Sequence, residues 1–234
     1  MNSAKTVKRR SYDSSRRQAQ ADETRSAIVR AARDLFIERG FGHTTLADVA
    51  RAAGVSVETI HKSIGTKAVL LHRAWDITIG GDDAEIVFHE RPEVIAIRQE
   101  TDLARRLVLH ARFATQTAQR IAPFQLMVQS AAGADPAAAA MLEEMGRQRY
   151  AGIGVMAAEA AATGQLAVSE DECRDVVWSM TDGMLWHRLV HERGWTNERF
   201  AEWLGQVWID RLVAKVSRPS RPRRAVASTH TPPA

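Results

Sequence analysis

Apolar residues recur at three- and four-residue spacing along most of the chain, which is the period of an α-helix with one buried face. Glycine, proline and N-capping residues mark where these runs start and stop. No run alternates between apolar and polar positions as a half-buried strand requires. The sequence therefore predicts an all-α fold, with helices at about 28–39, 45–53, 56–64, 67–80, 101–121, 136–164, 169–191 and 196–213.

Two stretches break this period. Residues 80–98 carry Asp and Pro out of phase with the apolar positions, so we expect a linker with at most one helical turn. Pro123 follows the helix at about 101–121 and is expected to end or kink it, because proline lacks the N–H that an internal turn needs. The pattern over 169–191 has no such break and predicts a continuous helix.

The N-terminal region contains two short helices joined by a tight turn. Thr45 with Asp48 three residues later has the spacing of a capping box, and Ser56 is suited to cap the second helix. Gly54 lies between them, where a tight turn requires a left-handed conformation. Val55 is expected to fill the core beneath that turn. This pattern is typical of a DNA-binding helix-turn-helix at about 45–64.

Residues 25–71 resemble the DNA-binding domain of the tetracycline-repressor (TetR) family. The matching positions are Arg25, Ile28, Ala32, Leu35, Phe36, Gly40, Phe41, Thr44, Thr45, Val49, Ala50, Ala53, Gly54, Val55, Ser56, Thr59, Ile60, Lys67 and Leu70. Two positions depart from the family pattern. His61 stands where the family usually has a phosphate-contacting Tyr, and Ile64 stands where it usually has a core Phe.

The resemblance implies which side chains contact DNA. Val57, Glu58 and Thr59 would face base edges, where a carboxylate can accept from cytosine N4 and a methyl group can contact thymine. Other side chains would lie near phosphates, namely Thr45, Ser56, His61, Lys62 and Lys67. Two alternatives stay open: Glu58 as an acid that only interacts with the helix dipole, and His61 as a cover for the helix surface.

By the same resemblance, the remaining helices form a domain that dimerises and holds a small-molecule effector. The helix at 169–191 is apolar around most of its circumference, so it must be buried on more than one side, by a partner subunit or within its own subunit. Candidate effector-binding residues are His110, Phe113, Met127, Met180 and Met184, with Trp186 nearby. Plain core packing is the alternative for each of them.

Charge is concentrated at the two ends of the chain. Residues 1–20 hold +5 and residues 211–234 hold +6, and the net charge of +4 leaves −7 for the body between them. We expect basic disordered tails at 1–20 and 216–234, which either meet a polyanion or merely keep the protein dissolved. The DNA-binding domain would span 21–80 and the effector-binding and dimerisation domain 81–215.

Several function classes are disfavoured. No run is long and apolar enough for a membrane span, and the single Cys173 fits a reducing cytoplasm. The sequence contains neither a Gly-rich phosphate loop nor a nucleophile elbow, so neither an enzyme nor a cofactor is expected. His187 and His191 have helical metal-ligand spacing, but Glu192 lies about 100° round the helix from His191, so no metal is expected. The expectation is a cytoplasmic regulator, most simply a repressor, that binds a palindromic DNA operator as a homodimer and is released by an effector.

Overall fold

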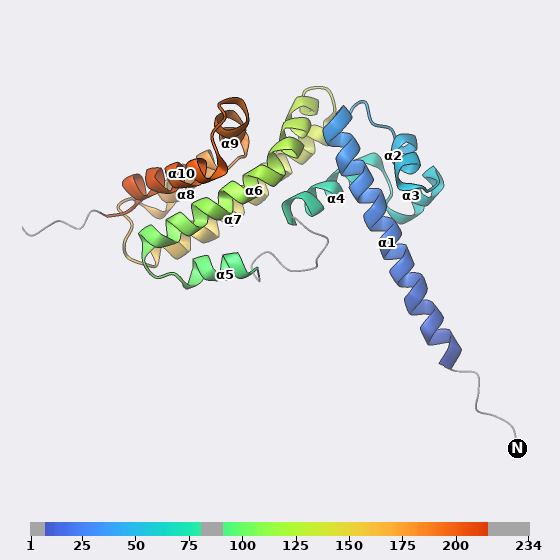
Figure 1. The fold of residues 1–234 in the computed structure, drawn as a ribbon, viewed down its shortest axis with the longest axis horizontal. Helices are drawn as coiled ribbons and strands as arrows, with labels where there is room; N and C mark the ends of the chain where they lie inside the picture. Colours follow the sequence, from blue (N-terminus) through green and yellow to red (C-terminus); the bar gives the residue numbers. More distant parts are fainter. Residues whose placement is uncertain (1–7, 81–90, 215–234) are drawn as a thin grey trace, which may run out of the picture.

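The computed structural model describes residues 8–80 and 91–214, and in these ranges the chain consists of helices joined by turns and short connections (Figure 1). The one β-feature of these ranges is an isolated antiparallel bridge between Leu166 and Val213. The prediction of an all-α fold is confirmed. The helices are α1 (Lys8–Arg39), α2 (Leu46–Ala53), α3 (Val57–Ser63), α4 (Lys67–Gly80), α5 (Pro92–Gln99), α6 (Leu103–Ala132), α7 (Pro136–Ala161), α8 (Glu170–Met180), α9 (Met184–Trp186), the π-helical turn η2 (His187–Glu192) and α10 (Asn197–Leu212).

The first hydrophobic core is formed by the four helices α1, α2, α3 and α4. It extends into the ends of α6 and α7 that face them. Ile28 and Phe36 of α1 and Leu70 of α4 are fully buried in it. Phe124 of α6 belongs to the same core and lies 5.9 Å, centroid to centroid, from the ring of Trp75. The Trp75 indole N–H also donates to Gln148 of α7 at 3.2 Å. The predicted N-terminal helices therefore pack on the long C-terminal helices as well as on one another.

A second core holds the rest of the C-terminal region. The long helices α6 and α7 lie side by side and carry α8, α9 and α10 along one flank (Figure 1). The side chains buried in this core come from all five helices, and the largest that is fully buried is Trp208 of α10. None of the described helices combines the length and apolar character that a membrane crossing requires.

The structure corrects the expectation of a disordered tail over residues 1–20. α1 begins at Lys8, so residues 8–20 are helical, while residues 1–7 lie outside the described ranges. The physical reason is composition, because Arg, Gln and Ala follow one another at 16–21 and are all good helix formers. Gln18 also donates to Asp22 one turn later, at 3.3 Å. The predicted basic tail at 216–234 falls outside the described residues.

Of the two outcomes expected at Pro123, an end or a kink of the helix, the structure excludes the end. The helix runs for 30 residues with Pro123 inside it, although an internal proline costs about 3 kcal/mol. The buried neighbours Ile121, Ala122 and Phe124 supply packing that offsets this cost. The linker expected before α6 also contains more than one helical turn. α5 is eight residues long and has Pro92 at its first position, where proline is favoured. Residues 81–90 of that linker lie outside the described residues.

The expected continuous helix at 169–191 is interrupted. α8 ends at Met180, where the Thr181 hydroxyl donates back to the Val177 carbonyl at 2.9 Å. Gly183 then adopts φ 77°, and a Cβ there would come within 3.1 Å of the Gln125 amide oxygen on α6. Only glycine combines this conformation with so close an approach. The Asp182-Gly183 dipeptide, a common turn signal, marks this break in the sequence.

Candidate nucleic-acid interface

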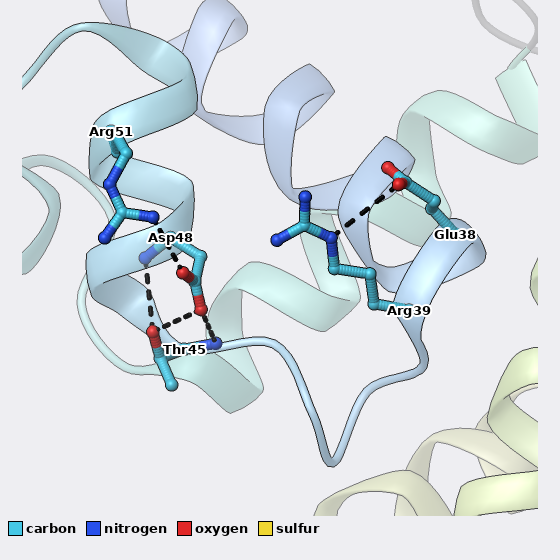
Figure 2. Close-up of polar contacts among 5 residues, drawn as sticks. All are labelled: Glu38, Arg39, Thr45, Asp48 and Arg51. Carbon is cyan, nitrogen blue, oxygen red and sulfur yellow. Dashed lines mark hydrogen bonds and ion pairs between the residues drawn. The ribbon is translucent and has the colours of Figure 1, made fainter.

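The start of α2 is fixed by a complete capping box between Thr45 and Asp48, which confirms the predicted pairing (Figure 2). The Asp48 N–H donates to the Thr45 hydroxyl at 3.2 Å, and the Thr45 N–H donates to the Asp48 carboxylate at 3.0 Å. The Thr45 hydroxyl also donates to the Asp48 carboxylate at 2.6 Å, and this hydrogen bond, together with that from the Thr45 N–H and a smaller contribution from Arg51, holds the pKa of Asp48 below its ordinary value. The Thr45 hydroxyl, predicted to contact a phosphate, thus already serves the helix start.

Gly54 makes the turn between the two short helices. Its φ of 67° and ψ of 31° are left-handed, and its N–H reaches the Ala50 and Arg51 carbonyls at the end of α2. The Val55 N–H donates to the Ala50 carbonyl at 2.9 Å, and the Val55 side chain packs on the first core. The turn and its apolar plug are therefore where the sequence placed them.

α3 has one anchored face and one exposed face. Ser56 caps it by accepting from the Thr59 N–H at 3.1 Å, and Ile60 is fully buried against the first core. Glu58, His61 and Lys62 are exposed on the outer side. Glu58 and Lys62, about three-quarters exposed each, form an ion pair at 2.7 Å. This arrangement leaves a short polar surface that a rigid support holds in place.

Two predicted contact positions, Val57 and Thr59, are only partly accessible, and the expected core position Ile64 is only partly buried. Val57 is half-buried and packs against the first core, so only part of its side chain is available to a ligand. Thr59 is half-buried and its hydroxyl lies 2.9 Å from that of Ser56. Ile64, which replaces the family's Phe, is half-buried against the same core.

Lys67, at the start of α4, is engaged within the protein. Its ammonium group donates to the Phe41 carbonyl and lies 4.2 Å from the centroid of the Phe41 ring. Burial at this place lowers the pKa of Lys67. A phosphate contact, as the resemblance implies, would have to use the remaining N–H groups of this ammonium.

Arg51 is a basic residue at this surface that the motif did not single out. It lies in the last turn of α2, is 76% exposed, and reaches Asp48 at 3.1 Å. Figure 2 places its guanidinium beside the capping box. Its signal in the sequence is the three-residue spacing from Asp48, which is one helical turn.

The candidate effector-binding residues do not gather at one place. His110 of α6 lies near Phe113 and Trp208, with centroid distances of 6.4 and 5.8 Å. Met127 is buried in the first core instead, about 25 Å farther along α6 at 1.5 Å per residue. Met180 packs half-buried on the second core, and Met184 begins α9 on the flank of α6. The structure therefore does not bring Met127 next to His110.

Two polar atoms near His110 lack hydrogen-bond partners although they are buried: the Nδ1 of His110 itself and the Nε1 of Trp208. Without a partner at Nδ1, burial lowers the pKa of His110 to about 4. Trp186, the other aromatic candidate, instead donates from its indole to Asn197 at 2.7 Å. A ligand with a hydrogen-bonding group could therefore bind the two unpaired nitrogens of His110 and Trp208 in this region.

His187 and His191 stack on each other in η2, with 4.7 Å between ring centroids. The His187 Nε2 lies 3.6 Å from the Glu192 carboxylate. Within residues 8–80 and 91–214, no three His, Cys, Asp or Glu side chains are placed to hold a metal ion. The pair is a surface feature of the turn.

The described N-terminal domain matches a known family. Residues 28–74 match the family model "Bacterial regulatory proteins, tetR family". Two curated Pseudomonas putida proteins are each 41% identical over 61 residues, namely the HTH-type transcriptional regulator TtgR and the probable HTH-type transcriptional regulator ArpR. The aligned region is 26% of this chain and spans 29% of the length of these relatives.

Solved structures resemble the chain over most of its length. A regulator from Saccharomonospora viridis in complex with choline has a TM-score of 0.62 at 18% identity, covering 83% of this chain and 100% of that one. NalD, the secondary repressor of the MexAB-OprM multidrug efflux pump in Pseudomonas aeruginosa, has a TM-score of 0.59 at 20% identity, covering 82% and 97%. At these identities the likeness concerns the fold, which includes the C-terminal helices.

Proposed function

We propose that this chain is a transcriptional repressor of the TetR family of bacterial regulatory proteins, which binds a palindromic operator as a homodimer and is released by a small-molecule effector. The family comprises regulators and not enzymes, in agreement with the prediction from the sequence. The observation that carries the proposal is the exposed outer side of α3, a helix that Ser56 caps and the buried Ile60 anchors to the first core.

The chemistry of α3 suits the major groove, which is about 12 Å wide and admits a helix. Glu58 and Thr59 lie in its first turn, where the recognition helix meets base edges. In the absence of DNA, Glu58 and Lys62 neutralise each other in an exposed pair. On DNA, Lys62 would turn to a phosphate and leave the Glu58 carboxylate to accept from cytosine N4. Further contacts to phosphates would then fix the position of α3 along the DNA. They would come from Ser56 and His61, and from Thr45 and Lys67 at the starts of α2 and α4.

The homodimer is supported by apolar surface on α8 and α10. These helices contact each other, and Val176, Trp203 and Val207 remain half-buried in the single chain. A two-fold dimer through this surface would place two recognition helices on half-sites about 34–36 Å apart, or a multiple of that distance.

The effector is proposed to bind beside His110, near Phe113 and Trp208. Aromatic surface would cover its apolar body, and the two unpaired nitrogens of His110 and Trp208 would meet a polar group. Choline in the similar Saccharomonospora viridis regulator is an organic ligand of this general kind.

Selection of duplexes from a random-sequence pool by the full-length protein tests the function. We expect an inverted repeat, and a footprint on both half-sites. Glu58→Gln should then change the preference at one base pair per half-site by about 1–3 kcal/mol, because it replaces a pure acceptor. Lys62→Gln is the matched control and should weaken binding evenly across sequences. Recovery of duplexes without a shared sequence would overturn the proposal.

A further inference from the structure

Much of α1 extends beyond the core that its other end helps to build. Residues 15–23 are all exposed, and Ile28 is the first fully buried side chain of the helix. We call residues 8–27 the α1 arm. At 1.5 Å per residue it is about 30 Å long. Figure 1 shows it projecting from the N-terminal domain on the side away from α5 to α10.

The arm and the residues before it are strongly basic. Residues 1–20 carry a net charge of +5, and the first turn of α1 contains no acidic residue. Arg16 and Arg17 are exposed in the described part of the arm. In the sequence they follow Arg9 and Arg10 by seven residues, which is nearly two helical turns, so these four positions repeat along one side of a helix. Asp13 is the single acidic residue of the sequence from 1 to 20, and the next acids, Asp22 and Glu23, follow Arg17; Asp22 pairs with Arg25.

This charge pattern does not serve the helix itself. Basic residues near a helix N-terminus oppose the positive end of the helix dipole, so they weaken rather than stabilise α1. Residues 15–23 of the arm are also exposed, so they lack the tertiary packing that supplies most of the stability of helices in proteins. An anion along the arm would relieve both deficits. Between residues 8 and 27 the chain has no Leu, Ile, Val, Met, Phe or Trp, so the arm has no apolar face for a membrane surface.

We propose that the α1 arm is a second DNA contact, which binds phosphates of the duplex flanking the base pairs that α3 meets. The inference rests on the proposed operator binding and extends it. Two observations point to duplex DNA: the charge complementarity, and the continuity of the arm with the interface. α1 is one helix whose buried end packs against α2, so the arm is rigidly connected to the recognition helix. Its length of about 30 Å approaches one turn of B-DNA.

The test uses the full-length protein with the double variant Arg16→Gln/Arg17→Gln. Gln and Arg have similar helix propensity, so α1 should persist, and circular dichroism verifies this. The control Arg112→Gln/Arg147→Gln removes the same charge from exposed positions on α6 and α7. Three duplexes are compared: the selected operator trimmed to its inverted repeat, the same operator with 10 base pairs added at each end, and a random-sequence duplex.

We expect the arm variant to bind the extended operator about tenfold or more weakly, with a salt slope lower by up to about two for each bound subunit. Binding to the trimmed operator should change little, and the control should match the wild type throughout. Equal affinity and equal salt slope of the arm variant and the control on the extended operator would overturn the inference. The inference would also be overturned if the arm variant lost binding only to vesicles of anionic phosphatidylglycerol and not to the extended operator.

Failure of the proposed function gives a different result. If the wild type selects no common sequence, operator recognition is refuted, and the random-sequence duplex still tests the arm. A lower salt slope of the arm variant on that duplex supports the arm contact by itself, whereas an unchanged slope refutes it.

Discussion

Acidification should destabilise this protein through one histidine, His110. Its Nδ1 is buried without a hydrogen-bond partner between α6 and α10, against the rings of Phe113 and Trp208. Nothing at Nδ1 compensates a positive charge, so burial lowers the pKa of His110 from 6.5 to about 4. The unfolded chain takes up this proton near pH 6.5, whereas the folded protein resists it until about pH 4.

The sign and size follow from this difference. Because the folded pKa is the lower one, the stabilisation is complete above pH 6.5 and is lost as the pH falls towards 4. A gap of this size corresponds to about 3 kcal/mol in full, of which about 2 kcal/mol is already lost at pH 5. The residue as a whole is only half-buried, so water stabilises its charged form in part, and these values are upper limits.

Urea unfolding at pH 7.5 and pH 5.0 measures the effect, with His110→Leu beside the wild type. The variant removes the titrating group together with its unpaired nitrogen, so its stability should fall less between the two pH values, by up to about 2 kcal/mol. His43→Leu is the control, because His43 is exposed in the folded protein as it is in the unfolded chain. If His110→Leu and the wild type lose equal stability on acidification, the reasoning is refuted.

Three further substitutions test the supports of the interface by urea unfolding. Thr45→Ala should cost about 1 kcal/mol by removing the cap of α2, and Thr45→Ser should retain most of it; equal losses in both would contradict the capping role. Gly54→Ala should cost about 1–2 kcal/mol because its φ is 67°, although a Cβ there meets no atom within 4 Å. Gly133→Ala, at an equally open site with φ −69°, should be neutral or slightly stabilising, and a cost there would point to another cause. Lys67→Met should destabilise the domain by about 1 kcal/mol through the lost hydrogen bond to Phe41, and a lower salt slope without that loss would assign Lys67 to phosphate alone.

The helix-turn-helix could be predicted because its determinants are local. Thr45 and Asp48, and Ser56 and Thr59, are partners three residues apart, so the sequence spacing contains the hydrogen bonds. Gly54 marks its own conformation, since few other residues adopt φ 67°. The Lys67 contact with the Phe41 carbonyl spans 26 residues and depends on how α1 meets α4, which no local pattern encodes.

The failures in the C-terminal region have the opposite cause. Pro123 ends a helix by its local chemistry, yet α6 continues because packing of its buried neighbours outweighs one lost hydrogen bond. The sequence offered His110 and Met127 as candidates for one effector pocket, whereas α6 carries Met127 to the first core and His110 to the side of Trp208 in the second. The break at Gly183 depends on the close approach of α6, although the Asp182-Gly183 dipeptide signalled a turn.

The shared role of α6 also bears on the predicted division between residues 80 and 81. Phe124 and Met127 of α6 complete the first core, while Leu107 and Ala111 of the same helix belong to the second. Unfolding the N-terminal helices alone would expose Phe124 and Trp75 and break the hydrogen bond of Trp75 to Gln148. Both regions should therefore unfold in one cooperative transition, detected alike by tryptophan fluorescence and by helical circular dichroism. Two separated transitions would show that α6 does not couple the cores, and the free energies assigned to His110 would then apply to the second core alone.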